Sequence, residues 1–141
     1  MAHVSIEGRI ASHDKKPFRG RIEIDTKTGL IVSVSKPKKK ADYVFGDGCL
    51  IFAGFGDVHI HAREDETGKQ VYKEEYATAA DAALHGGVVH VAAMPNTPNP
   101  VVGKKEFEWH RKRIASLSTP VAILNYLGID SKTKPIGRPG E

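Results

Sequence analysis

The sequence predicts an α/β fold in two parts: a β-rich N-terminal subdomain at residues 1–56, then the first strands and helices of a parallel α/β domain at residues 57–141. The first part contains only short apolar runs separated by turn residues, which is typical of strands. From Ala53 onward, strand-like apolar runs alternate with segments of helical periodicity. Strands that alternate with helices pair in parallel through right-handed crossovers, so the second part is predicted to form a parallel sheet.

The N-terminal part is interpreted as a small antiparallel sheet. The loop at residues 25–29 is predicted to form a hairpin turn, because Asp and Thr side chains bond nearby backbone groups and Gly supplies a positive φ. Ile22 and Ile24 alternate with polar residues, which predicts that one face of the sheet is buried. The expected strands are residues 4–10, 21–24, 30–34, 43–45 and 49–52.

Apolar strands and intervening helices are predicted to follow one another in the second part. Residues 88–93 are almost continuously apolar, as expected of a strand that is buried on both faces of a parallel sheet. The helix before this strand shows alanines and tyrosines at helical spacing and ends at paired glycines. The expected strands are residues 57–61, 88–93 and 121–126, and the expected helices are residues 72–85 and 104–116.

The composition indicates a soluble globular protein. The chain has 141 residues and is 40% hydrophobic, which is enough for an ordinary domain with an apolar core. No apolar run approaches the roughly 18 residues of a membrane span and the chain start does not resemble a leader, so we expect a cytoplasmic protein without membrane contact. The net charge of +4 is too small to indicate a class of binding partner. The basic run at residues 36–40 is interpreted as a solvated turn, and no nucleic-acid partner is predicted.

The single cysteine restricts the chemistry available to the chain. Cys49 excludes an intramolecular disulfide and a site built from several cysteines. It precedes an apolar run and is predicted to be a small buried residue. Any metal site in this chain must therefore use histidine and carboxylate side chains.

Polar residues suited to metal and anion binding follow two neighbouring predicted strands. Side chains two apart on a strand point to the same face, so His59, His61 and Arg63 line up about 6.6 Å apart per pair if the strand stays extended. Two imidazoles can then converge on one metal ion, and the planar guanidinium of Arg63 suits a carboxylate. Asn96 follows the second strand in a proline-stiffened loop, so its amide should lie at the same edge of the parallel sheet.

Each of these residues also has a simpler interpretation. A histidine pair can arise without metal binding, an arginine after a strand usually forms a surface ion pair, and an asparagine between prolines usually forms a turn. The four residues are expected at the same edge of the predicted parallel sheet, and this convergence favours a functional site over the separate simpler interpretations. His90 is interpreted as a hydrogen-bonded core residue rather than a ligand, and His85 as a partner of a helix C-terminus. No role is predicted for His3, His13 and His110.

Two segments resemble the signatures of a known family. The stretch at residues 54–64, which includes Asp57-Val58-His59-Ile60-His61-Ala62-Arg63, resembles the opening barrel strand of dihydroorotases in the amidohydrolase superfamily. Residues 93–97, Ala-Met-Pro-Asn-Thr, resemble the second signature of that family. The histidine pair alone would indicate only the superfamily, whereas Arg63 together with Asn96 narrows the resemblance to dihydroorotases. Ala53 replaces a usual proline and Ala62 a usual bulky residue, and neither position is a ligand.

This resemblance implies a (β/α)8 (TIM) barrel, of which the chain would hold only the first strands and helices. It implies one or two zinc ions, with His59 and His61 as ligands of the more buried metal. Arg63 and Asn96 would hold the α-carboxylate of the substrate. The implied reaction is attack of a metal-activated hydroxide on a ring amide, which interconverts dihydroorotate and N-carbamoyl-L-aspartate in pyrimidine biosynthesis.

The resemblance assigns no catalytic residue to this chain. The remaining ligands and the catalytic aspartate would lie on later strands, and a closed barrel needs roughly 200 residues or more. The loop-like end at residues 134–141 therefore indicates a fragment, which we expect to be inactive alone. The implied partners are the small-molecule substrate and either a second copy of the protein or another pyrimidine-pathway enzyme.

Two alternatives stay open. A hydantoinase-like or allantoinase-like cyclic amidohydrolase would share the histidine pair but would act on a ring without a carboxylate at Arg63. A non-catalytic dihydroorotase-like scaffold would keep the front of the fold and partner another enzyme. Later sequence without further histidines and an aspartate at strand ends would favour the scaffold.

Overall fold

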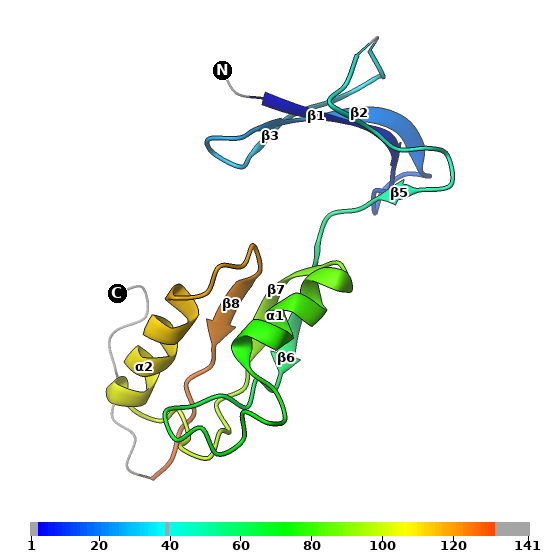
Figure 1. Ribbon diagram of the computed structural model, residues 1–141. Helices are drawn as coiled ribbons and strands as arrows, with labels where there is room; N and C mark the ends of the chain where they lie inside the picture. The colour runs from blue at the N-terminus through cyan, green and yellow to red at the C-terminus, as the bar shows by residue number, and fades with distance from the viewer. Residues whose placement is uncertain (1–2, 39, 132–141) are drawn as a thin grey trace. The chain divides into compact units, whose positions relative to one another are not determined.

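The computed structural model describes residues 3–38 and 40–131 (Figure 1). The chain forms two compact units, one up to Ala53 and one from Gly54 onward. The boundary proposed from the sequence, at residue 56, falls inside β6 (Phe55–Ile60), the first strand of the second unit. The loop-like end at residues 134–141 lies outside the described residues.

The first unit is a mixed sheet rather than the purely antiparallel one predicted. Its antiparallel part has the strand order β3-β2-β1. The chain then crosses to the other edge of β1, and β4 and β5 both pair with β1 in parallel. The long connection after β3 explains the difference. A tight hairpin joins antiparallel strands, whereas a connection that crosses from one edge of the sheet to the other can place the next strand parallel to its neighbour. The strands are β1 (His3–Ile10), β2 (Phe18–Asp25), β3 (Ile31–Ser35), β4 (Tyr43–Val44) and β5 (Leu50–Ile51).

The predicted hairpin turn between β2 and β3 is confirmed. The side-chain Oδ1 of Asp25 accepts the backbone N–H groups of Lys27 at 2.7 Å and Thr28 at 3.2 Å. Gly29 has a φ of 72°, the left-handed conformation that a side chain would disfavour. Side-chain capping and glycine freedom therefore form this turn, as expected from the residue types.

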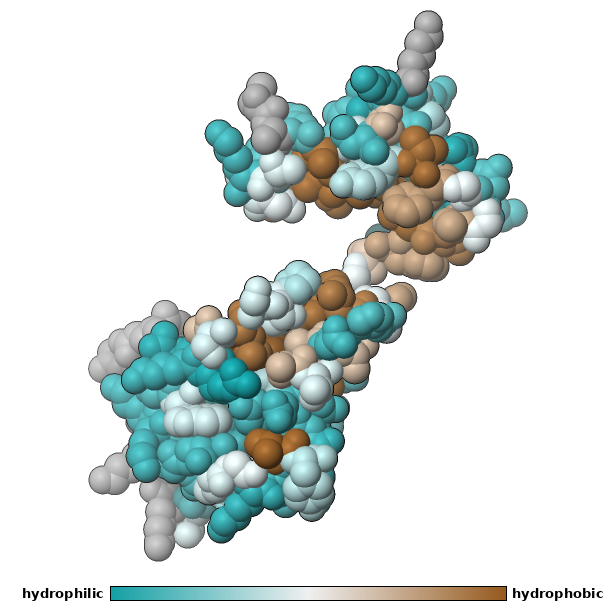
Figure 2. All heavy atoms as spheres, in the orientation of Figure 1, coloured by the Kyte–Doolittle hydropathy of each residue, from teal (hydrophilic) through white to brown (hydrophobic). Residues whose placement is uncertain are grey.

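The apolar face predicted for the first unit is only partly buried, with Ile22 and Ile24 half-buried. Ser5 and Glu7 are buried, and Glu7 pairs with Arg21 at 3.1 Å. Ile31 and Val34, on the outer strand, are exposed, and Figure 2 shows apolar residues at the surface of this unit. The reason is that a single sheet can bury its apolar side only against a second layer, and the described residues of this unit supply none.

Two further expectations concern the loops of the first unit. Cys49, predicted to be buried, is exposed, because it closes a turn by donating its N–H to Gly46 O at 3.0 Å instead of entering a strand. Lys36 and Lys38 are exposed, as predicted for a solvated turn, and Lys39 lies outside the described residues. The backbone N–H of Lys38 donates to Glu7, which lowers the pKa of that carboxyl group.

The second unit is a parallel sheet of order β6-β7-β8 with two helices (Figure 1). Its elements after β6 are α1 (Tyr76–His85), β7 (Val88–Ala93), α2 (Lys104–Ala115) and β8 (Ala122–Asn125). Residues of both helices share one core with the sheet, so both helices cover the same face. The predicted order of strands and helices and the bounds of β7 are confirmed.

The other face of the parallel sheet is open within the described residues. Val58 on β6 is 70% exposed and Leu124 on β8 is 64% exposed, while Val91 on β7 is buried under α1. His90 also lies on the open face and is exposed, so its interpretation as a core residue is wrong. The predicted burial of β7 on both faces holds only at its end, where Val91 and Ala92 are both buried. Alternation along a strand sends successive side chains to opposite faces, and here the helices cover only one of them.

Helix α1 begins later than predicted, at Tyr76 rather than residue 72. The carboxylate of Glu64 accepts the N–H of Tyr76 at 2.9 Å, and the Thr78 hydroxyl accepts the N–H of Glu75 at 3.2 Å. An acidic oxygen at the first free N–H groups stabilises a helix start and its dipole. Tyr72 lies in the preceding loop and is exposed. Within the described residues, no helix is both long enough and apolar enough to cross a membrane.

Candidate functional site

The site begins where β6 departs from regular pairing. Asp57 pairs with Val91 and Ile60 pairs with Ala93, so β6 carries one residue more than β7 over this stretch. The carboxylate of Asp57 accepts the backbone N–H of His59 at 2.9 Å within the irregular segment. An extra residue in one strand bends it and re-aims the side chains around it. The expectation of an extended strand through His61 is therefore wrong, and the irregularity lies at the histidine pair.

The two histidine rings lie close enough to share one cation. The ring centroids of His59 and His61 are 5.3 Å apart, and both residues are exposed. With a zinc–nitrogen bond of about 2.0 Å and a ring centre about 1.1 Å beyond the nitrogen, two rings at a roughly tetrahedral angle have centroids about 5 Å apart. The observed separation fits that requirement. Among the described residues, no group of three or more His, Cys, Asp or Glu side chains is placed to hold a metal ion.

Asn96 joins the end of β7 to the end of β6. Its side-chain Oδ1 lies 3.0 Å from Nδ1 of His61, and its backbone carbonyl accepts a hydrogen bond from Nη1 of Arg63 at 3.2 Å. The structure thus brings together His59, His61, Arg63 and Asn96, the four residues that the sequence singles out. Arg63 is partly exposed and Asn96 is exposed.

A buried carboxylate, not foreseen from the sequence, ties the two loops of the site together. Asp65 accepts the N–H of Asn99 at 2.7 Å and that of Thr67 at 2.9 Å. Burial disfavours the charged form of Asp65, but the hydrogen bonds from Thr67 and Asn99 outweigh it and lower its pKa. Asp65 follows Arg63 by two residues and Asn99 follows Asn96 by three, so this contact fixes the spacing between Arg63 and Asn96.

Glu64 connects the loop after β6 to both helices. One carboxylate oxygen caps Tyr76 at the start of α1, and the other accepts a hydrogen bond from Nε of Arg113 on α2. The side chain of Glu64 is only 9% exposed and that of Arg113 is 31% exposed. A largely buried pair of this kind positions the helices relative to the loop that carries Arg63.

Replacement of Arg113 with alanine is expected to lower the free energy of unfolding by about 2–3 kcal/mol, because it leaves the buried carboxylate of Glu64 without its cation. Arg111→Ala on the same helix is the matched control. Arg111 pairs with Glu108 at 2.8 Å, but the two side chains are 65% and 35% exposed, so its loss should cost under about 1 kcal/mol. Urea unfolding of the protein that contains this chain measures both, and equal losses would contradict the assignment.

A directed chain of hydrogen bonds crosses the core of the second unit. The Tyr76 hydroxyl donates to Oδ1 of Asn125 at 3.0 Å and lies 2.6 Å from Nδ1 of His110. Because the hydroxyl has one proton, Nδ1 of His110 is the donor in the second contact. Burial raises the pKa of Tyr76 to about 12. The sequence assigned no role to His110, since its hydrogen-bond partner Tyr76 lies 34 residues away and only the fold brings the two together.

Burial of His110 predicts a loss of stability in mild acid. Burial lowers the pKa of His110 below its ordinary value of 6.5, against the opposing charges of Asp65 and Glu64. The unfolded chain therefore takes up this proton first as pH falls, so stability is complete above pH 6.5 and declines below it. The slope from this one proton is at most about 1.4 kcal/mol per pH unit.

Unfolding titrations of the wild type and of His110→Gln, from about pH 7 to pH 5, measure this contribution. We expect the variant to be less stable at neutral pH but to lose less stability on acidification. Parallel curves over that range would show that His110 does not contribute.

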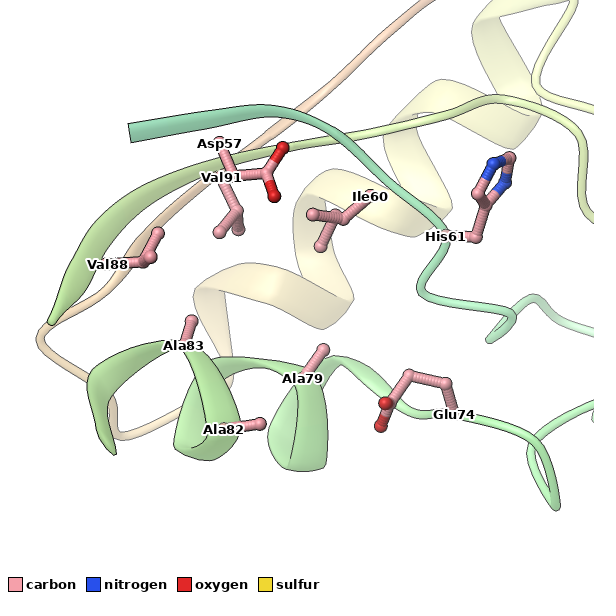
Figure 3. A pocket seen from close by; sticks show the side chains of 9 residues that line it. All are labelled: Asp57, Ile60, His61, Glu74, Ala79, Ala82, Ala83, Val88 and Val91. Atoms are coloured by element: carbon pink, nitrogen blue, oxygen red, sulfur yellow. The ribbon is translucent and has the colours of Figure 1, made fainter. Parts of the chain in front are cut away.

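A hollow of about 220 Å³ lies between β6 and α1 (Figure 3). Alanines of α1 form one side of it, with Asp57, His61 and Glu74 as its polar lining. The ring of His61 points away from α1 in Figure 3. The hollow therefore reflects small side chains on α1 rather than the space in front of the histidine pair.

Comparison with known proteins places these features in one family. A family model described as dihydro-orotase-like matches residues 48–136, which include all four site residues. The chain belongs to the dihydroorotase-like family. It is 39% identical over 121 residues to a dihydroorotase of Geobacillus sp. (strain WCH70), covering 84% of this chain. It is 35% identical over 136 residues to a dihydroorotase of Bacillus caldolyticus, covering 95% of this chain.

The chain spans 27% and 30% of the length of these two relatives. Among solved structures, an L-hydantoinase (dihydropyrimidinase) from Arthrobacter aurescens superposes with a TM-score of 0.70 at 21% identity, over 89% of this chain and 27% of that one. A D-hydantoinase superposes with a TM-score of 0.59 at 24% identity, over 79% of this chain and 24% of that one. At these identities the structural likeness concerns the fold alone. This chain has the same kind of α/β fold as the matching parts of those two proteins.

Proposed function

We propose that this chain supplies the first part of the active site of a dihydroorotase, which interconverts dihydroorotate and N-carbamoyl-L-aspartate in pyrimidine biosynthesis. Membership of the family supports cyclic amide chemistry. The observation that carries the choice of substrate is the placement of Arg63 and Asn96 beside the histidine pair, joined by a hydrogen bond of 3.2 Å. A cation site next to a carboxylate-binding group matches a cyclic amide that bears a carboxylate.

The metal site of this proposal uses His59 and His61 as its first ligands. Zinc, as one or two ions, bound there would polarise the ring amide carbonyl and make water nucleophilic near neutral pH. The two imidazoles are exposed at the end of β6, and their ring centroids lie 5.3 Å apart, a separation that suits ligands of one ion. Further ligands and the catalytic acid–base group lie outside this chain in the proposal, because the described residues hold only the histidine pair at this position.

The substrate site of this proposal uses Arg63 and Asn96. A guanidinium presents parallel N–H donors that match the two oxygens of a carboxylate, and the Asn96 amide adds neutral donors beside it. Both side chains are held by contacts between the ends of β6 and β7. A fixed carboxylate clamp orients the ring so that its reacting amide faces the metal, which lowers the entropic part of the barrier.

The proposed fold of the whole protein is a (β/α)8 barrel. The open face of the β6-β7-β8 sheet, with Val58 and Leu124 exposed, would then line the barrel interior, and the helices would form part of its outer ring. Active-site residues of such barrels lie at the carboxyl ends of the strands, where His61, Arg63 and Asn96 stand. A cytoplasmic location and a second copy or another pyrimidine-pathway enzyme as partner belong to the same proposal.

A substrate panel tests the proposed function. Dihydroorotate and dihydrouracil share the same ring and differ by one carboxylate. The protein that contains this chain is expected to hydrolyse dihydroorotate with a kcat/KM at least about 100-fold higher than that for dihydrouracil or hydantoin, since an unsatisfied carboxylate clamp costs several kcal/mol. Equal or higher activity on the rings that lack a carboxylate would favour the hydantoinase-like alternative. No zinc-dependent turnover of any ring would favour the scaffold.

A further inference from the structure

We infer that Asn96 is a positioning residue for the metal ligand His61, in addition to any contact with substrate. This inference rests on the proposed function for the existence of the metal site. The side-chain Oδ1 of Asn96 lies 3.0 Å from Nδ1 of His61. An amide oxygen can only accept a hydrogen bond, so Nδ1 of His61 must carry the proton. The other ring nitrogen, Nε2, then keeps its lone pair and can bind a cation.

Asn96 is held firmly enough to perform this role. Its backbone carbonyl accepts a hydrogen bond from Arg63, and the loop after it is closed by the hydroxyl of Thr97 on the carbonyl of Asn99 at 2.6 Å. The buried carboxylate of Asp65 anchors the same loop through the N–H of Asn99 at 2.7 Å. The backbone that carries Asn96 is therefore held at its carbonyl and in the loop that follows, although the residue itself is exposed.

The two ends of the Asn96 amide have different tasks. Oδ1 fixes the proton of His61, whereas Nδ2 has no hydrogen-bond partner among the described residues and keeps its two donors for an anion. One side chain thereby sets the tautomer of a metal ligand and faces the substrate carboxylate. Partners that orient a metal-binding histidine typically change metal affinity by about 10-fold to 100-fold when they are removed.

Two substitutions separate these tasks. Asn96→Ala removes both the acceptor and the donors, whereas Asn96→Asp keeps an acceptor for His61 and replaces the donors with a carboxylate that repels the substrate. Asn99→Ala is the matched control, because it alters the same residue type in the same loop and loses only the side-chain bond to Glu66. None of these side chains is buried, so the variants are expected to fold.

The first measurement needs no metal. Nitrogen-15 NMR of the metal-free protein, above the ordinary titration range of imidazole, reports which ring nitrogen of His61 is protonated. We expect the Nδ1–H tautomer in the wild type, in Asn96→Asp and in Asn99→Ala. In Asn96→Ala we expect a mixture of tautomers, because the acceptor is gone.

The second measurement is zinc affinity by competition with a chelator, with His59→Ala identifying the site. Asn96→Ala should lower the affinity by about 10-fold or more, while Asn96→Asp and Asn99→Ala keep it at least at the wild-type level. For Asn96→Asp, kcat/KM for dihydroorotate should fall even though zinc stays bound. Retention of wild-type zinc affinity in Asn96→Ala, or of the Nδ1–H tautomer in that variant, would overturn the inference.

The outcomes also separate this inference from the proposed function. If zinc binds and Asn96→Ala weakens it, but the enzyme prefers rings without a carboxylate, the substrate assignment fails and the positioning role stands. If dihydroorotate is the preferred substrate and zinc affinity is insensitive to Asn96→Ala, the positioning role fails alone. If His59→Ala does not alter zinc binding, both fail.

Discussion

Replacement of His61 with alanine is expected to lower the turnover of dihydroorotate by at least about 1,000-fold, or roughly 4 kcal/mol of transition-state stabilisation. The ring of His61 lies 5.3 Å from that of His59 and is half of the proposed donor pair. Its loss leaves a single imidazole on this strand, so both metal content and polarisation of the amide should decrease. Steady-state kinetics and elemental analysis of bound zinc measure the two effects in the protein that contains this chain.

His85→Ala is the matched control for this prediction. His85 is exposed in the last turn of α1, where its Nδ1 lies 2.8 Å from the carbonyl oxygen of Asp81. It has no contact with the histidine pair, so the variant should keep wild-type zinc content and turnover. A His61→Ala variant with full zinc content and full activity would remove His61 from the metal site.

Replacement of Arg63 with methionine is expected to lower kcat/KM for dihydroorotate by about 100-fold or more, or about 3 kcal/mol, while the low activity on dihydrouracil changes little. Methionine keeps much of the length of the side chain but removes the charge and the donors that a carboxylate requires. Kinetics on the two rings separate a loss of carboxylate recognition from general damage to the site. Equal losses on both rings would contradict the assigned role.

Arg63→Lys refines this test. Lysine keeps the positive charge but lacks the planar fork, so an intermediate loss on dihydroorotate is expected if two parallel hydrogen bonds are formed. Full activity of the lysine variant would show that charge alone is sufficient. Both variants also remove the guanidinium bond to the Asn96 carbonyl, so zinc affinity should be measured alongside.

The sequence by itself determined the parts of this protein that depend on local pattern. The strand at Val88–Ala93 follows from a continuous apolar run, and the turn at Asp25 follows from side chains that bond their own backbone. The meeting of His61 and Arg63 with Asn96 could be predicted because parallel strands place their carboxyl ends at one edge. These predictions need only residue type, period and chain direction.

Only the tertiary structure decided the features that depend on which segments pair and what covers them. The irregular register between Asp57 and Ile60, next to the histidine pair, depends on the pairing of β6 with β7. Asp65 meets Asn99 across 34 residues, and Tyr76 meets Asn125 across 49. The exposure of His90 and of the apolar side of β3 depends on which faces other layers cover. Burial and long-range hydrogen bonds are properties of the assembled layers, so a local pattern cannot supply them.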